Sequence, residues 1–149
     1  MAGKTNRRWI RVKLDDLGTT DVDISESVSS VGPTGLTYNQ KDVTGYSDGW
    51  INFTLGRANA PVTVTGPYSN TVDSTMNHVL VHAEDGILGY QGASSTLTIE
   101  YGEKAAPGTP DPVFAGEYYA SSYIINGADM TYTAEFVPAS ATAPTWSTL

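Results

Sequence analysis

Apolar and polar residues alternate with a period of two along several short stretches of the chain. In the first stretch, residues 8–14, Ile10, Val12 and Leu14 fall on one side of an extended backbone, and basic side chains fall on the other. This alternation is typical of a strand with one face in a core and one face in solvent. The same pattern predicts further strands over residues 21–24, 36–43, 61–66 and 96–101.

One segment changes to a helical period. Apolar residues recur there at the spacing that places side chains on one face of a helix, namely Met76, Val79, Leu80, Ala83 and Ile87. A capping residue at 73 or 74 and a glycine at 86 or 89 bound the segment. The pattern predicts a single α-helix over about residues 74–86.

The C-terminal part predicts a long β-hairpin, residues 114–125 and 130–137, with Asn126-Gly127 as the turn signal. Directly opposed residues of antiparallel strands share a face, so the hairpin has two different sides. We expect one side to pack in the core, with Tyr119, Tyr123, Ile125, Met130, Tyr132 and Phe136. The other side is small, hydroxylated and mildly acidic, with Ala120, Ser122, Thr131, Thr133 and Glu135.

Length and composition agree with these elements. A chain of 149 residues is one domain's worth of protein and can bury a real core. Threonine, serine, tyrosine, valine and isoleucine are abundant, which favours strands, while 15 glycines and 8 prolines supply turns. We therefore predict one mainly β domain over residues 1–149, an antiparallel β-sandwich or barrel flanked by one helix.

A long excursion over residues 45–60 does not fit a simple sandwich. It carries Trp50, Ile51, Phe53 and Leu55 between glycine-containing turns. These side chains either fold back into the core or lie exposed and cover a neighbouring subunit. Because long loops with apolar tips tend to be functional, we favour the interface. The tail, with Trp146 as an aromatic anchor, has the same two interpretations.

Charge is distributed unevenly along the chain. Eight basic residues face sixteen acidic ones, and five of the eight lie within the first 13 residues. The net charge of −8 disfavours binding in a nucleic-acid groove. The basic head, which includes Arg7, Arg8 and Arg11, is either a solvated terminus or a contact for an acidic partner such as a second copy.

Candidate chemistry is sparse. His78 and His82 are four residues apart on the predicted helix, a spacing that can bind zinc, but no third ligand stands in a fixed relation to them. We expect both on the outer face of the helix. The acidic pairs Asp15/Asp16 and Glu84/Asp85 sit at element ends, where carboxylates commonly serve solubility and capping.

No nucleophile elbow, phosphate-binding loop, Walker motif or calcium loop is present in the sequence. The absence of cysteine excludes disulfides, thiolate zinc sites, iron–sulfur clusters and a cysteine nucleophile. No apolar run reaches the length of a membrane-spanning helix, and the N-terminus lacks the apolar region of a secretory signal. We expect no enzymatic activity, no cofactor and no metal.

The order of these elements resembles the major tail tube proteins of long-tailed, siphovirus-type bacteriophages, over roughly residues 8–146. The resemblance is carried by a basic first strand, an acidic short strand, a long loop with an apolar tip, one helix and a long final hairpin. The pattern of residue types along the strands is most similar in three segments, Leu36-Thr-Tyr-Asn-Gln-Lys-Asp-Val-Thr-Gly, Phe114-Ala-Gly-Glu-Tyr-Tyr-Ala-Ser-Ser-Tyr-Ile-Ile-Asn-Gly and Met130-Thr-Tyr-Thr-Ala-Glu-Phe-Val-Pro.

The resemblance implies a structural virion protein that polymerises into stacked, hexameric rings around a channel for the genome. The long loop 45–60, an N-terminal arm 1–8 and a C-terminal arm 138–149 would bridge subunits and rings. The interface set is then Arg7, Arg8, Arg11, Trp50, Ile51, Phe53, Leu55, Arg57 and Trp146, and the channel-lining set is Ser122, Thr131, Thr133 and Glu135.

The resemblance also implies partners and a location. The partners are further copies of the chain and the tail tip, terminator and tape-measure proteins, with DNA only in transit and no membrane contact. The protein would be made in the host cytoplasm and reside in the virion tail. An acidic channel suits this role, because it repels the phosphates of a passing genome.

Two other classes fit the same composition. A capsid decoration or head–tail connector protein would share the β-rich, acidic, enzyme-free character but would not polymerise alone into tubes. A carbohydrate-binding β-sandwich is conceivable with nine tyrosines and three tryptophans, and it requires aromatic side chains exposed in a groove.

Overall fold

The computed structural model describes residues 10–15, 21–71, 74–81, 86–88, 94–102, 106–139 and 143–149. Its described residues are mainly β, with antiparallel sheets and one short α-helix, which confirms the predicted fold class. The strands are β1 (Ile10–Asp15), β2 (Asp21–Asp23), β3 (Ser30–Val31), β4 (Thr37–Asp42), β5 (Phe53–Asn59), β6 (Val62–Pro67), β7 (Ser95–Tyr101), β8 (Pro112–Asn126), β9 (Thr131–Pro138) and β10 (Thr145–Thr148). The helices are α1 (Met76–Val81) and a 3₁₀ turn, η3 (Ser25–Ser27).

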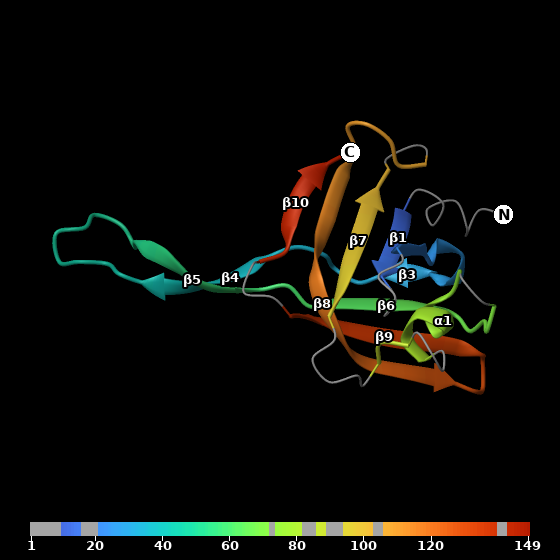
Figure 1. The fold of residues 1–149 in the computed structure, drawn as a ribbon. Coiled ribbons are helices and arrows are strands. Elements are labelled where there is room, and N and C mark those ends of the chain that lie inside the picture. The colour runs from blue at the N-terminus through green and yellow to red at the C-terminus, as the bar shows by residue number, and fades with distance from the viewer. Residues whose placement is uncertain are drawn as a thin grey trace.

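The main sheet has the strand order β2-β1-β7-β8-β9-β6-β3, with β10 added on β8. Its long strand β8 joins two layers, because its first half pairs with β7 and its second half pairs with β9. Figure 1 shows β1, β7 and β10 running across the direction of β6 and β9. The body is therefore a sandwich in which one strand belongs to both layers.

The segment between β2 and β3 closes one side of this sandwich. β2 pairs with β1 at one end of the strand order, and β3 pairs with β6 at the other end. Between them, the amide of Val12 donates to Ser25 Oγ at 2.9 Å, and the amide of Ser29 donates to the carbonyl of Thr65 at 2.8 Å. The two ends of the sheet are thus tied together by one short stretch of chain.

The core lies between the layers and beneath α1. β1, β6 and β7 each contribute one face to it, as their alternation predicts, whereas β4, predicted from the same pattern, is exposed along its whole length. The fully buried aliphatic and aromatic side chains include Val12, Leu14, Val62, Val64, Leu97, Ile99, Phe114 and Phe136, together with Met76, Val79 and Leu80 of the helix.

The helix is shorter than its predicted range, and residues 82–85, including His82, lie outside the described residues. The prediction that His78 faces outward is wrong, because His78 is 4% exposed. The amides of Ile87 and Leu88 donate to the carbonyls of Val79 and Leu80, so the chain after the helix folds back onto it. The helix is covered on more than one side, which its periodicity does not reveal.

The C-terminal hairpin agrees with prediction near its turn and differs further away. Tyr123 pairs with Ala134 and Ile125 pairs with Tyr132, as expected, but Ile125 is exposed and not part of the core. A bulge between Ala120 and Ser122 then shifts the register, so Tyr118 is buried while Tyr119 lies on the outer face. The extra residue of the bulge reverses which side chains point inward.

Two further placements in this hairpin are corrected. Ala120 pairs with Phe136 and packs against the core, although it was expected on the polar side. Met130 was expected in the core but belongs to the four-residue turn between β8 and β9, where it is half exposed. Its φ of 54° follows from the tight reversal of the chain at that position.

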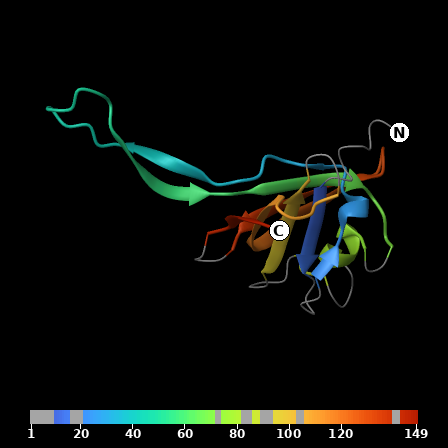
Figure 2. The same ribbon diagram turned by 90° about the horizontal axis from the view of Figure 1, so that it is seen from above.

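β4 and β5 form a separate two-stranded sheet that projects from the body. Figure 2 shows that this hairpin extends away from the body and that β5 leads into β6, so the arm continues in the direction of that strand. The strand expected over 36–43 is present, but its partner is β5, whereas residues 53–59 were expected to be part of a loop. We call residues 37–59 the arm.

Candidate functional site

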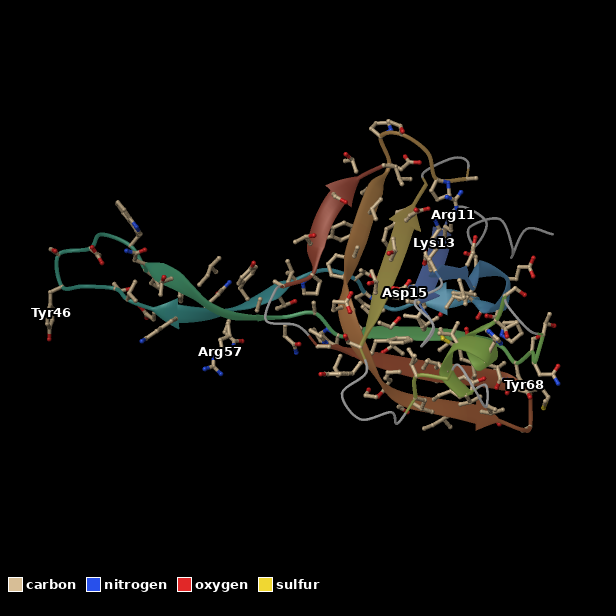
Figure 3. All side chains as sticks on the ribbon, viewed as in Figure 1. Arg11, Lys13, Asp15, Tyr46, Arg57 and Tyr68 are labelled. Atoms are coloured by element: carbon tan, nitrogen blue, oxygen red, sulfur yellow. The ribbon has the colours of Figure 1, made fainter. Side chains whose placement is uncertain are left out.

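The arm exposes the apolar side chains that the sequence singled out. Trp50 and Ile51 at its tip are 77% and 67% exposed, and Phe53 and Leu55 on β5 are also exposed. The interpretation that these residues fold back into the core is therefore wrong. Figure 3 places Tyr46 at the far end of the arm and Arg57 along it, away from the body.

The pairing of β4 with β5 gathers the exposed apolar residues of the strands on one face. Asp42 pairs with Phe53, Gln40 pairs with Leu55, and a bulge separates them from the pair of Tyr38 with Ala58. Alternation along each strand then puts Tyr38, Phe53 and Leu55 on the same side, together with their neighbours Gln40 and Asp42. Lys41 and Thr54 occupy the opposite side. An isolated hairpin is marginally stable in water, so we expect another protein surface to pack against these apolar side chains.

Side-chain hydrogen bonds fix the tip of the arm. The carboxylate of Asp42 accepts from the amide and the hydroxyl of Thr44, at 2.9 and 2.6 Å. The Thr44 hydroxyl in turn accepts from the amide of Asn52 at 2.8 Å, and the Asp48 carboxylate accepts from the amide of Gly45 at 2.7 Å. These bonds to charged Asp42 hold its pKa below the usual range. The tip is thus an ordered loop.

The arm is electrically neutral. It carries Lys41 and Arg57 against Asp42 and Asp48, whereas the rest of the chain has six basic and fourteen acidic residues. Among the described ion pairs, none involves Lys41 or Arg57. The arm therefore differs from the acidic body in charge as well as in shape.

The predicted channel-lining residues come together on the outer face of the β6–β9–β8 layer. Ser122 pairs directly with Glu135, while Thr133 and Thr131 of β9 pair with Ile124 and Asn126. The pairing with β6 adds Thr63 beside Glu135 and Thr65 beside Thr133. We did not assign these two threonines from the sequence, although their alternation with Val62 and Val64 is the signal that could have identified them.

This outer face is polar around Ser122 and Glu135, but it also carries three exposed apolar side chains, those of Ile124 and of the directly paired Tyr119 and Val137. Hydroxyl groups dominate it, and Ser30 of β3 extends the row through a 2.6 Å hydrogen bond between its hydroxyl and that of Thr65. Ile124 stands among them and is 66% exposed. Glu135, between Ser122 and Thr63, adds a carboxylate to the face, which is therefore mildly acidic.

The basic residues of β1 are engaged within the chain. The guanidinium of Arg11 lies 2.8 Å from a carboxylate oxygen of Glu100, and the ammonium of Lys13 lies 3.6 Å from the other oxygen. Glu100 is 4% exposed, so the two cations compensate a buried charge. Arg7 and Arg8 lie outside the described residues. Figure 3 shows Arg11, Lys13 and Asp15 along the same strand.

Asp15, one of the acidic residues considered for catalysis, faces other carboxylates. Its pKa is raised, first by partial burial and then by the negative charges of Asp21 and Glu117. Thr96 donates a hydrogen bond to the carboxylate of Glu117. These groups form an acidic edge of the body, and the hydroxyl of Ser94 donates a second hydrogen bond to Glu117, at 3.0 Å.

Trp146 packs on its own chain through β10. Its ring centroid lies 5.0 Å from that of Phe114 and 6.0 Å from that of Tyr101. β10 pairs with the first residues of β8, and the amide of Leu149 donates to the carbonyl of Asp111 at 3.0 Å. The contact of this tail with another copy stays a prediction, and half of the Trp146 side chain is open to solvent.

The described residues contain no group of three or more His, Asp or Glu side chains that could hold a metal ion. Among the helices of that same part of the chain, none has the length and apolar character needed to cross a membrane. Glu84 and Asp85 lie outside it. The exposed arm and the hydroxylated outer face are therefore the features on which a functional interpretation can be built.

Comparison with known proteins gives a likeness in fold. No family model matches the chain, and no curated protein matches its sequence. Among solved structures, the fold is similar to a chain in the cryo-electron microscopy structure of the sheath–tube complex of PVC, an extracellular contractile injection system, in the extended state. The TM-score is 0.56 with 12% identity, over 93% of this chain and 89% of that chain. The likeness spans nearly the whole of both chains and shows a shared fold.

Proposed function

We propose that this chain is a structural subunit of a tail tube, which assembles with copies of itself into stacked rings around a channel. The observation that carries the proposal is the arm, an ordered hairpin whose apolar face has no cover among the described residues of its own chain. A second copy would bury that face. The fold shared with a chain of a sheath–tube complex supports the same class.

The sequence resembles tail tube proteins of long-tailed bacteriophages, whereas the similar solved chain comes from a contractile injection system. The proposal is therefore for the class of tail-type tube proteins that both suggest. Six copies in each ring, a place in the virion tail and contacts with tip, terminator and tape-measure proteins follow from the sequence resemblance. No catalytic role is proposed.

Each predicted surface has a place in this proposal. The arm, including Arg57, covers a neighbouring subunit, and the hydroxylated face with Ser122, Thr131, Thr133 and Glu135 lines the channel. Its lack of basic residues avoids binding the phosphates of passing DNA. The residues 1–8 and the tail with Trp146 bridge rings. Because Arg11 is paired with Glu100, a bridging role for the basic head rests on Arg7 and Arg8.

Electron microscopy of the purified full chain in negative stain, across a range of concentrations, tests the proposal. We expect hollow tubes of stacked rings from the wild type. The double variant F53T/L55T keeps strand-forming residues but removes the apolar face of the arm, and it should remain unassembled. The matched variant T54S changes the opposite face of the same strand and should form tubes.

The other outcomes separate the alternative classes. Isolated single rings would indicate a connector, and monomers or trimers at every concentration would favour a capsid decoration protein. Tubes formed equally well by F53T/L55T would contradict the role given to the arm while leaving the tube itself in place.

A further inference from the structure

A shallow groove lies between the β3–β4 connection and the start of β8. It has a volume of about 490 Å³ and is lined by Val31, Pro33, Tyr101, Pro112 and Trp146, together with Gly32 and Thr34. No charged side chain is among its lining residues. We call it the proline–aromatic groove.

The groove is held in shape by its own contacts. The hydroxyl of Tyr101 donates to Thr34 Oγ1 at 2.6 Å, and that oxygen donates to the carbonyl of Gly32 at 3.1 Å. Trp146 is fixed on its inner side by Phe114 and Tyr101 and remains 48% exposed. A ligand that enters this groove therefore meets a preformed aromatic surface, and little ordering is needed on binding.

The tip of the arm is the complementary element. Trp50 and Ile51 project from a loop that is fixed by the hydrogen bonds of Asp42, Thr44 and Asp48. Figures 1 and 2 show this tip at the far end of the arm, away from the body, so it does not reach the groove of its own chain. Any insertion must be into another molecule.

We infer that the arm of one copy inserts Trp50 and Ile51 into the proline–aromatic groove of a second copy. This inference rests on the proposed function and names the surface that receives the arm. Charge favours a second copy at this contact, because the arm is neutral and the groove has no charged lining, whereas the remaining surfaces of two acidic chains repel each other. Aromatic anchors in preformed pockets are the usual centres of such interfaces.

Disulfide trapping tests this contact, and the absence of native cysteine removes background. Gly49→Cys places a thiol beside Trp50, where an added Cβ has no atom within 4 Å. Pro33→Cys places the second thiol on the exposed wall of the groove. Under oxidation, the assembled G49C/P33C variant should give a ladder of covalent multimers on non-reducing gels, because each chain carries both halves of the contact.

The matched control is G49C/G127C. Gly127 also has no atom within 4 Å of an added Cβ, but it lies in the β8–β9 turn. We expect no ladder from this control, and at most dimers from either single variant. A ladder from G49C/G127C without one from G49C/P33C would overturn the inference and place the arm elsewhere on the second copy.

A second measurement does not depend on disulfide geometry. Trp50→Ser in the tip and Pro33→Asp in the groove should each raise the critical concentration for assembly by about 30-fold, the effect of losing one strong interface residue. Tyr46→Ser, at an exposed tip position outside the inferred contact, should change it little.

The two proposals fail in different ways. Tubes that form normally while G49C/P33C gives no ladder and P33D assembles like the wild type would overturn the groove contact and leave the tube subunit in place. A chain that never associates, with no covalent multimers from any variant, would overturn both.

Discussion

Two tyrosine hydroxyl groups tie separate elements of the body together. The hydroxyl of Tyr132 donates to the carbonyl of Ser27 at 2.6 Å, and the side chain of Ser27 accepts from the amide of Met76 at 3.0 Å. The hydroxyl of Tyr118 donates to the carbonyl of Ala60 at 2.7 Å. Ala60 lies between β5 and β6, so Tyr118 holds the backbone where the arm meets the body.

Alkaline pH should weaken the fold through these tyrosines. Burial raises the pKa of Tyr118 from 10.0 to about 12 and raises that of Tyr132 further. The unfolded chain therefore loses these protons first, so the free energy of unfolding should fall as pH rises from about 10 to about 12. Urea unfolding of wild type and Tyr118→Phe across this range measures the effect, and the variant should show a shallower fall. An identical pH dependence would show that Tyr118 ionises freely in the folded state.

Gly66 occupies a position where no side chain fits. A Cβ at this residue would lie 1.9 Å from the carbonyl oxygen of Ser27, which is backbone and cannot move aside alone. Gly66→Ala should therefore lower the free energy of unfolding by about 2 kcal/mol or more, measured by urea denaturation. Gly127→Ala, where an added Cβ has no neighbour within 4 Å, should leave stability nearly unchanged. Equal stability of the two variants would mean that η3 and β6 can separate at little cost.

At the scale of elements, β9 and β10 lie one after the other along the same edge of β8. Pro138 pairs with Tyr118 and Thr145 pairs with Ala115, so the intervening chain leaves the edge and returns opposite Gly116. Pro144 packs directly on this glycine, since an added Cβ would lie 2.7 Å from the Pro144 Cβ. The lack of a side chain at 116 thus allows β10 to rejoin the sheet.

Gly116→Val should detach β10 while leaving most of the sandwich in place. The new side chain collides with Pro144, and the strand it displaces is only four residues long and exposed. Amide hydrogen exchange should become faster at residues 145–149, including Leu149, whose amide donates to Asp111. Gly49→Val in the arm serves as the control. Unchanged protection of residues 145–149 would contradict the role given to this glycine.

At the scale of the whole molecule, charge should oppose assembly. Each chain carries −8, and charges on neighbouring copies repel each other wherever they lie within a Debye length, about 10 Å at 0.1 M salt. Added salt should therefore lower the critical concentration for tubes, as measured by light scattering with electron microscopy. If salt dissolved the tubes instead, ionic contacts between copies, such as those of the basic head, would outweigh both repulsion and the apolar arm contacts.

Much of the fold and part of the candidate site could be predicted from the sequence alone. The period of two located β1, β6 and β7 with their inward faces, and the polar side of β9 was assigned correctly. Tyr119 and Ala120 were misassigned because one bulge residue changes the parity of all residues beyond it. His78 was misassigned because the segments that bury a helix face lie elsewhere in the chain, and the period of the helix itself does not reveal them.

Local patterns therefore determined the features that depend on neighbours in the chain, which are the strand segments and their apolar faces. They also indicated that the loop is not an ordinary one, because it carries Trp50, Ile51, Phe53 and Leu55. Only the tertiary structure decided that residues 53–59 pair with β4 as a projecting arm, that β10 returns to β8, and that Arg11 neutralises Glu100. These are long-range pairings, and their partners are separated by many residues of chain. Strand periodicity fixes the two faces of a strand but carries no information about which edge it will meet.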